Sequence, residues 1–428
     1  MTSPNGRFTP SGRSAHAVST AMADAPSSMT APSPRGNARL RPRVTALLLV
    51  AVVALAGPAF AQTFQQVGFA GLGDTNNNNT GSMAIYNSML YVGTGNFTTG
   101  TEVWRYDGSV WTQVNSDGFG DANNRSTNCL MVYGGRLYVG TYNPTSGAEV
   151  WEYDGSAWIQ VNSNGFGSAS NQWANSMAEH GGNLVVGTGN IASGLQVWEY
   201  DGSTWSQIAT GGFGDTDNHN ASSMAVDGGL LYVATYKTVG PGGEVWSYDG
   251  ATWSQVNTDG FGDANNFGSH SLVAFGGMVY AGTYNRFTGT EIWQYDGSVW
   301  IQVNADGFGT ADNQTSQAAV VMNGALYIGT ANANDGAEVW EWDGSAWRGI
   351  VSGGFGDPNN AAIASNGLAE FGGYLIAGTF NPDGGEVWEI DPQQNQGPVP
   401  AIPVLSGYGL LALAAIIGIV AVCILRKT

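Results

Sequence analysis

The chain has 428 residues, 43% of them hydrophobic, and a formal net charge of −19 at pH 7. Between residues 62 and 400 there are 32 Asp and Glu but only six Lys and Arg. This charge excludes nucleic acid and anionic lipid as partners, because both are bound through basic residues. The two cysteines, Cys129 and Cys423, are not expected to meet in a structural disulfide, so stability must come from the fold.

Residues 1–61 have the organisation of a secretory signal peptide with a long first region. Basic residues precede a short apolar stretch, and an Ala-x-Ala site follows it: Arg35, Arg39, Arg41 and Arg43, then 44–56, then Ala59 and Ala61. The apolar stretch is too short to span a bilayer comfortably. We therefore expect export and cleavage before Gln62, with Met22 and Met29 as alternative translation starts.

Residues 62–391 contain seven copies of one motif. The Trp of a Glu-Val-Trp-like triplet recurs every 47 or 48 residues, at Trp104, Trp151, Trp198, Trp246, Trp293, Trp340 and Trp388. Each copy contains four short apolar runs, which in the second copy are Leu130–Tyr133, Leu137–Thr141, Glu149–Tyr153 and Ala157–Val161. Gly-Gly and Asp-Gly pairs between the runs are typical of two-residue hairpin turns. The pattern predicts an all-β fold, a seven-bladed β-propeller of four-stranded antiparallel blades with strands a to d.

The seventh copy lacks its fourth strand, which is found at the other end of the repeat region. Phe64-Gln65-Gln66-Val67 aligns with Trp111-Thr112-Gln113-Val114, 47 residues later. We therefore expect the N-terminal strand to complete blade seven and close the ring. Closure removes the open edge that a linear array of blades would expose.

The repeat resembles kelch-like propellers, which also combine Gly pairs, a Leu-Tyr-Val strand and two spaced aromatic residues. Here the pair Gly134-Gly135 precedes the Leu-Tyr-Val strand, whereas kelch repeats carry their diagnostic pair after it. The resemblance implies the propeller fold and none of the family's partners.

The long d–a and b–c loops share one face of the predicted propeller, where a binding site is expected. The d–a loop repeats Gly-Phe-Gly-Asp-x-x-Asn, and its Asp and Asn oxygens could bind Ca²⁺ or hold turns. These residues are Asp74, Asn77, Asp121, Asn124, Asp215, Asn218, Asp263, Asn266, Asp357 and Asn360. Ser168 and Thr310 replace the Asp in two copies, which favours the turn role. The Glu beside Trp in strand c could bind a sugar, but core packing is the favoured role.

Residues that break the repeat are the better candidates for binding. Trp173 is expected in the d–a loop of blade three, and Lys237 interrupts the Asn series of the b–c loop. Further candidates on this face are Tyr142, Tyr236, Tyr284, Phe380, Arg125, His219 and Arg286. Together they could form an asymmetric patch for a glycan or a protein, although an ordinary variable surface explains the same residues.

No catalytic residue is predicted from the sequence. It shows no metal-ligand spacing of His, no nucleophile elbow and no phosphate-binding Gly loop. We expect a non-catalytic binding module without a cofactor. The alternatives are a hydrolase or lyase that acts on polysaccharides at the channel mouth, and a purely structural surface component.

Beyond a Gln- and Pro-rich linker at 392–401, residues 402–428 predict a membrane segment. Ile402-Pro403-Val404-Leu405-Ser406 precedes an apolar stretch at 408–425 that ends in Arg426 and Lys427, as in a transmembrane helix with a cytoplasmic basic end. This order resembles the IPTL-type C-terminal sorting signals of Gram-negative bacteria, with Val404 and Tyr408 in place of the usual Thr and Trp. The resemblance implies an exosortase-like processing protease and a location at the cell surface or in the extracellular matrix. A plain membrane anchor is the alternative.

Overall fold

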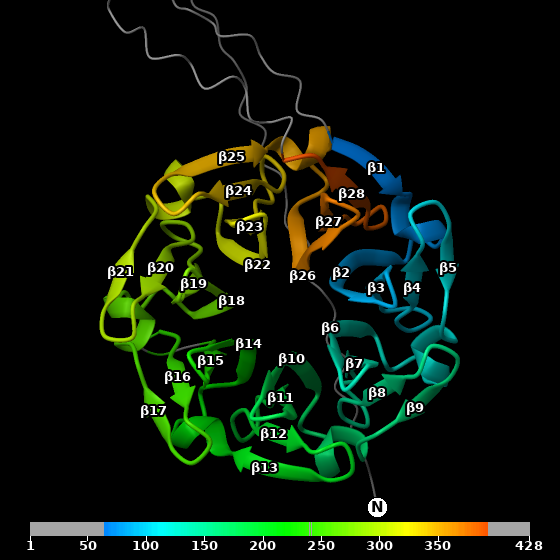
Figure 1. Cartoon of the computed structure of the whole chain (residues 1–428), viewed down its shortest axis with the longest axis horizontal. Helices are drawn as coiled ribbons and strands as arrows, with labels where there is room; N and C mark the ends of the chain where they lie inside the picture. The colour runs from blue at the N-terminus through cyan, green and yellow to red at the C-terminus, as the bar shows by residue number, and fades with distance from the viewer. Residues whose placement is uncertain (1–63, 239, 241, 393–428) are drawn as a thin grey trace, which may run out of the picture. The chain divides into compact units, whose positions relative to one another are not determined.

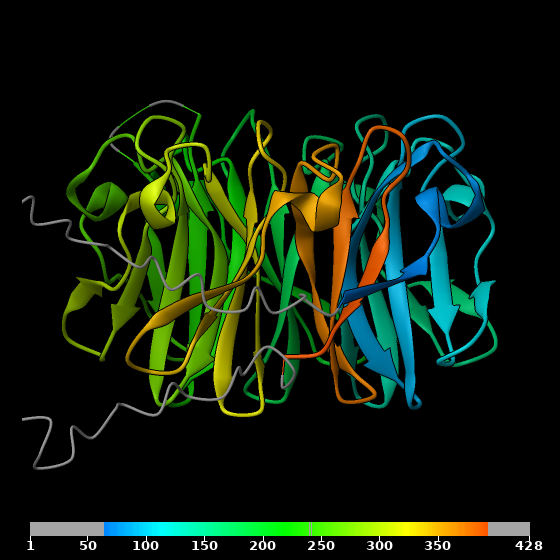
Figure 2. The same ribbon diagram turned by 90° about the horizontal axis from the view of Figure 1, so that it is seen from above.

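The computed structural model describes residues 64–392 except 239 and 241, all within the unit Pro58–Thr428. These residues form 28 strands and seven short 3-10 turns. The strands form seven four-stranded antiparallel blades, which single pairings between neighbouring blades join into one 28-stranded sheet. The blades surround a common axis, as Figures 1 and 2 show. The predicted seven-bladed all-β fold is confirmed. The predicted signal peptide, most of the linker and the sorting segment lie outside the described residues. Among the residues that the structure does describe, no helix is long and apolar enough to cross a membrane.

Each blade runs from an innermost strand a to an outermost strand d. The a strands are β2 (Asn77–Tyr86), β6 (Ser126–Tyr133), β10 (Trp173–His180), β14 (Asn220–Asp227), β18 (Gly268–Phe275), β22 (Thr315–Met322) and β26 (Ala362–Phe371). The b strands are β3 (Met89–Asn96), β7 (Arg136–Tyr142), β11 (Asn183–Gly189), β15 (Leu230–Tyr236), β19 (Met278–Tyr284), β23 (Ala325–Ala331) and β27 (Tyr374–Phe380).

The outer half of each blade is shorter. The c strands are β4 (Val103–Tyr106), β8 (Val150–Tyr153), β12 (Val197–Tyr200), β16 (Val245–Tyr248), β20 (Ile292–Tyr295), β24 (Val339–Trp342) and β28 (Val387–Ile390). The d strands are β5 (Trp111–Gln113), β9 (Trp158–Gln160), β13 (Trp205–Ala209), β17 (Trp253–Gln255), β21 (Trp300–Gln302), β25 (Trp347–Val351) and, in blade seven, β1 (Phe64–Gly68). The 3-10 turns are η1 (Ala70–Gly73), η2 (Asp117–Gly120), η3 (Asn164–Gly167), η4 (Gly211–Gly214), η5 (Asp259–Gly262), η6 (Asp306–Gly309) and η7 (Gly353–Gly356).

The N-terminal strand closes the ring as predicted. β1 pairs with β28 in antiparallel register, with Phe64 opposite Ile390. The Phe64 ring makes edge contacts with Phe355, 5.3 Å away between centroids, and with Trp388, 5.4 Å away. In Figure 1, β1 lies beside β28, which comes from the other end of the propeller sequence.

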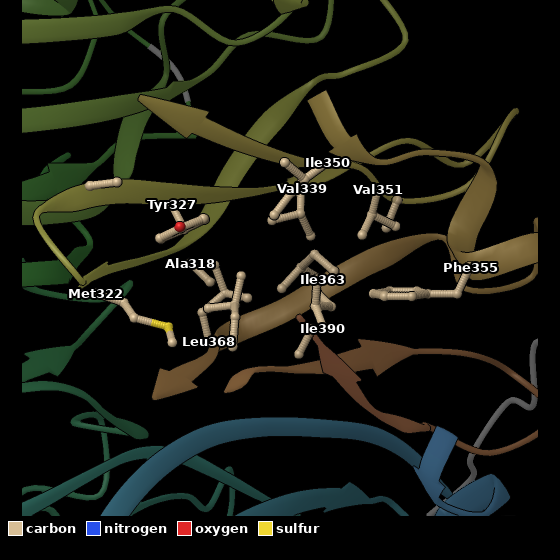
Figure 3. Packing of buried hydrophobic residues seen from close by; sticks show 14 residues of the cluster. Ala318, Met322, Tyr327, Val339, Ile350, Val351, Phe355, Ile363, Leu368 and Ile390 are labelled. Atoms are coloured by element: carbon tan, nitrogen blue, oxygen red, sulfur yellow. The ribbon is translucent and has the colours of Figure 1, made fainter. Parts of the chain in front are cut away.

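The apolar core lies between adjacent blades. In Figure 3, Val339 and Ile350 of blade six lie against Ile363 and Ile390 of blade seven, and all four are buried. Similar clusters join the other blades around the ring. Burial of these apolar faces is the main favourable contribution to the stability of the fold.

A buried polar network repeats beside this core. In blade five, Asn266 Nδ2 donates to the Gly260 carbonyl at 2.9 Å and to Glu291 Oε2 at 2.8 Å. Trp293 Nε1 donates to the same carboxylate oxygen at 2.8 Å. Burial raises the pKa of Glu291, and the hydrogen bonds from Asn266 and Trp293 partly offset this increase. The recurring Glu-Trp pair therefore packs the blade, as predicted.

Candidate functional site

The a strands begin earlier than the sequence predicted. Strand a of blade two was expected at Leu130, but β6 begins at Ser126. Trp173, expected in a loop, is the first residue of β10 and pairs with Gly189 and Tyr142. The prediction was wrong because an unpaired residue interrupts the alternation of apolar and polar side chains that marks a strand.

That unpaired residue forms a β-bulge near the start of strand a in blades two to six. The bulge residues are Asn128, Asn175, Ser222, His270 and Gln317. Each stands four residues after the constant Asn of its d–a loop, and this position varies in size among Asn, Ser, His and Gln, whereas the residues on either side of it are all small. Bulges re-aim side chains and are common beside functional sites. This variation is the signal that sequence reasoning missed.

Four of these bulge residues line a cavity of about 210 Å³ at the mouth of the central channel. The cavity is lined by Asn79, Ser126, Thr127, Asn128, Trp173, Asn175, Asn220, Ser222, Tyr236, His270, Ser365 and Asn366, which come from six of the seven blades. We call it the mouth cavity. None of the described residues that line it is Asp, Glu, Lys or Arg.

Two of the predicted aromatic candidates, Trp173 and Tyr236, line the mouth cavity. The rings of two more, Tyr142 and Tyr284, contact them. The Trp173 ring stacks on Tyr142 with centroids 4.7 Å apart and an angle of 8° between the planes. Tyr236 meets the bulge residue His270 edge-on at 5.4 Å, and Tyr284 contacts both of these rings. The predicted patch therefore consists of two aromatic groups on separate parts of the cavity rim.

The other candidates do not line the cavity. Arg125 stands over Phe97 at 5.9 Å, and Arg286 stands over Phe267 at 5.0 Å and Phe287 at 5.2 Å. His219 is buried, with its Nδ1 3.3 Å from Thr238 Oγ1. Phe380 is 39% exposed, and no ring contact joins it to another aromatic residue in the part of the chain described.

Three residues that line the mouth cavity carry buried polar atoms without a hydrogen-bond partner among the described residues. They are Oδ1 of Asn79, Oδ1 of Asn220 and Nε2 of His270. Leaving such a group unsatisfied costs about 1–3 kcal/mol, so each one calls for an explanation. They are three of the seven such atoms among the described residues, and all three belong to residues that line one cavity.

The cavity is uncharged at neutral pH. Burial lowers the pKa of His270 to about 4, and burial raises the pKa of Tyr236. Both side chains are therefore neutral and able to form ordinary hydrogen bonds.

The lowered pKa of His270 predicts a pH dependence of stability. Because the unfolded chain protonates this residue near its ordinary pKa of about 6.5 and the folded chain does not, stability should fall as the pH drops from about 6.5 to 4. The variant His270→Gln should lose this part of the pH dependence, measured as melting temperature across that range. Parallel curves for the two proteins would contradict the assignment.

The candidate calcium ligands are engaged in the turn network. Asp263 Oδ1 accepts a hydrogen bond from the Asn265 backbone at 2.9 Å, and its Oδ2 accepts one from Asn285 at 3.2 Å. Both polar atoms of the Asn266 side chain form hydrogen bonds, because Asn285 Nδ2 donates to its Oδ1 at 3.0 Å. Within the described part of the chain, no group of three or more His, Cys, Asp or Glu is arranged to hold a metal ion. These contacts favour the turn role.

Comparisons with known proteins add little. No family model and no curated protein matches the chain. Among solved structures, it is similar to the SapL1 lectin in complex with alpha methyl fucoside, with 15% identity over 63% of this chain and 94% of the lectin and a TM-score of 0.43. It is also similar to the GH74 xyloglucanase from Xanthomonas campestris, with 16% identity, a TM-score of 0.46 and coverage of 72% of this chain and 52% of the enzyme. At these values the similarities carry no functional argument, and the kelch-like resemblance stays a prediction.

Proposed function

We propose that this protein is a non-catalytic module that binds a neutral carbohydrate in the mouth cavity. The observation that carries the proposal is an uncharged cavity in which Trp173 and Tyr236 stand beside amides, hydroxyls and three unpartnered polar atoms. Sugar hydroxyls both donate and accept hydrogen bonds, and the C–H faces of a sugar ring pack on aromatic rings. Apolar and aromatic walls with a few convergent polar groups are typical of small-molecule sites.

A glycan suits the cavity better than a protein does. A stable protein interface buries roughly 800 Å² on each partner and has an apolar centre. The mouth cavity is about 210 Å³ and is lined mainly by Asn, Ser and Thr. Its size and polarity favour a small hydroxyl-rich ligand.

The alternative of a glycoside hydrolase is disfavoured by the same lining. Such enzymes generally place two carboxylates on either side of the scissile bond. No Asp or Glu is among the described residues around the cavity. A lyase would have to use Tyr236 and His270, which are adjacent, as its acid and base. Release of products from a polysaccharide would favour a lyase over a binding module.

Replacing Trp173 by Ala tests the binding proposal. Neutral sugars that bind the wild type on a glycan array, with and without EDTA, would be titrated by calorimetry. We expect Trp173→Ala to weaken binding at least tenfold, which corresponds to about 1.4 kcal/mol, because the stacking surface is lost.

Phe69→Ala is the matched control, because Phe69 is 72% exposed in the d–a loop before η1 and does not line the cavity. It should bind as the wild type does. Equal affinity of Trp173→Ala and the wild type would contradict the proposed site. An array without any bound glycan would contradict the function and favour a structural surface component.

Export and surface display belong to the same proposal. They rest on the sequence of residues 1–61 and 402–428, including the resemblance to sorting signals. A module that binds glycans at the cell surface or in the matrix would need this route.

A further inference from the structure

Blade seven departs from the other blades at the mouth cavity. Leu368 follows Asn360 by eight residues, whereas Leu130 follows Asn124 by six. The pairing of β26 with β27 is broken between Ile363 and Leu368, where blades two to six have a one-residue bulge. We call residues 364–367 the blade-seven insertion.

The insertion extends beyond its own blade into the channel. A Cβ atom at Gly81 of blade one would lie 2.9 Å from the Ser365 carbonyl oxygen and 3.0 Å from Ala364 Cβ, so only glycine leaves room there. Asn366 Nδ2 donates to the Asn128 carbonyl of blade two at 3.1 Å. Ser365 Oγ donates to Gln317 Oε1 of blade six at 2.8 Å. The insertion therefore contacts blade six on one side of blade seven and blades one and two on the other.

The insertion also borders two cavities along the channel. Ser365 and Asn366 line the mouth cavity, while Asn366 and Leu368 line a second cavity of about 220 Å³. The second cavity lies further along the a strands and is lined in part by one apolar residue from each blade: Met83, Leu130, Met177, Met224, Leu272, Ala319 and Leu368. A polar ligand that enters from the long-loop face meets the insertion and then this apolar ring.

We propose that the blade-seven insertion is the floor of the carbohydrate site and restricts it to one terminal residue of a neutral glycan. This inference rests on the proposed function. The volume of the mouth cavity, about 210 Å³, is below the roughly 300–1,000 Å³ of sites for drug-sized ligands, so it suits a single sugar ring. A glycan bound through an internal residue would need a second exit, which the insertion and the apolar ring obstruct. An acidic sugar would find no basic partner among the described lining residues.

Removal of Ser365 and Asn366 tests this inference. The deletion restores the spacing of the other blades, so the blade should still form. Calorimetry would compare methyl glycosides of glucose, galactose, mannose and fucose with linear oligosaccharides that carry each sugar at the non-reducing end. We expect the wild type to bind its preferred methyl glycoside within about threefold of the matching oligosaccharide. The deletion should weaken methyl glycoside binding at least tenfold.

A second variant covers the case in which the deletion fails to fold. Asn366 has a φ of +55°, which glycine adopts easily, so Asn366→Gly should keep the backbone while losing the hydrogen bond to blade two. We expect at least threefold weaker methyl glycoside binding at an unchanged melting temperature. Wild-type affinity that rises with every added sugar, or unchanged binding by both variants, would overturn the inference and leave the proposed function standing. A wild type that binds none of these sugars would overturn the proposed function itself.

Discussion

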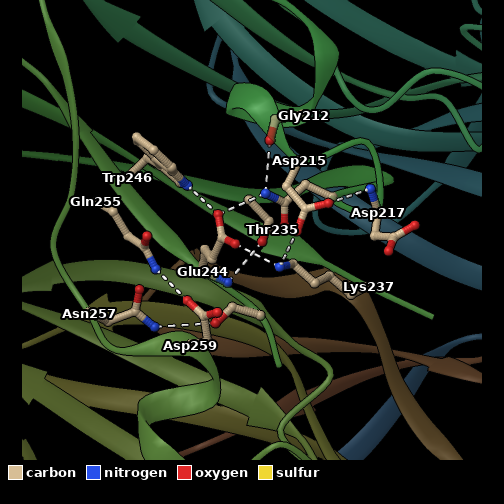
Figure 4. Close-up of polar contacts among 12 residues, drawn as sticks. Gly212, Asp215, Asp217, Thr235, Lys237, Glu244, Trp246, Gln255, Asn257 and Asp259 are labelled. Atoms are coloured by element: carbon tan, nitrogen blue, oxygen red, sulfur yellow. Dashed lines mark hydrogen bonds and ion pairs between the residues drawn. The ribbon is translucent and has the colours of Figure 1, made fainter. Parts of the chain in front are cut away.

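Replacing Lys237 by Met is expected to lower the free energy of unfolding by about 3–5 kcal/mol. Lys237 Nζ lies 2.8 Å from Asp215 Oδ2 and 2.6 Å from Glu244 Oε1, and its side chain is only 1% exposed (Figure 4). Burial alone would lower the pKa of Lys237, but hydrogen bonds from its ammonium group to the two carboxylates raise it overall. Met would fill the space but donate no hydrogen bond, so neither the Glu244 and Asp215 carboxylates nor Asn218 Oδ1 would have a donor at this position.

Lys237→Asn is the matched control, because Asn occupies this position in the other six blades. In blade five the equivalent Asn285 donates to Asn266 and Asp263. Blade four offers the same partners, since Asn218 Oδ1 is unpartnered among the described residues. We therefore expect Lys237→Asn to remain within about 1 kcal/mol of the wild type, because two hydrogen bonds replace the two ion pairs and Glu244 keeps its hydrogen bonds from Asn218 and Trp246.

Thermal and denaturant unfolding at neutral pH would measure both variants. The hydrogen bond from Lys237 lowers the pKa of Asp215, so the stability it contributes is present above the ordinary pKa of the carboxyl and is lost as the pH falls through the lowered value. The gap between Lys237→Met and the wild type should accordingly narrow in acid. If Met and Asn had the same small effect at neutral pH, the ion pair would not be the stabilising feature of this loop.

The repeat made the fold predictable from the sequence. Six complete copies define one blade, and the strand missing from the seventh copy identifies Phe64–Val67 as its replacement. The recurring Glu-Trp pair was also assigned correctly, because a residue that recurs in every blade most simply serves the blade. Regular spacing identifies the residues that pack the blades, because all blades share the same packing.

The site was less predictable, because it lies where the repeat is irregular. Trp173 and Tyr236 were recognised as departures, but the bulge residues were assigned to loops. The spacing of the recurring Trp residues also does not reveal the blade-seven insertion. Its two extra residues are partly offset by a b–c loop one residue shorter, in which Gly384 follows Asn381 by three residues where Gly289 follows Asn285 by four. The interval from Trp340 to Trp388 is therefore 48 residues, as it also is in blade four.

A chain shortened to begin at Phe69 should lose about 5 kcal/mol or more of stability, on the order of 10 °C in melting temperature. It would lack β1, whose Phe64 ring packs on Phe355 and Trp388. It would also lack the Val67 carbonyl, which accepts a hydrogen bond from Trp111 Nε1 at 2.7 Å. The hydrogen bond joins blade seven to blade one, and the ring contacts hold β1 against β28 and η7.

Two point variants of β1 should have smaller effects on stability, which differ with the burial of the side chain. Phe64→Ala removes a partly buried ring and should cost about 2–3 kcal/mol, below the 3–5 kcal/mol of a fully buried Phe. Gln65→Ala alters an exposed side chain of β1 and should change stability by less than about 0.5 kcal/mol.

Removal of β1 also exposes an unpaired edge on β28, where Ile390 and Val387 are fully buried in the intact ring. Such an edge is a template for pairing with another chain, so the shortened protein should associate in a concentration-dependent way. Sedimentation velocity and thermal unfolding over a range of concentrations would measure both effects. A shortened chain that stays monomeric and melts with the wild type would show that β1 is not needed to close the propeller. Loss of stability together with association would show that the ring depends on the pairing of its two ends.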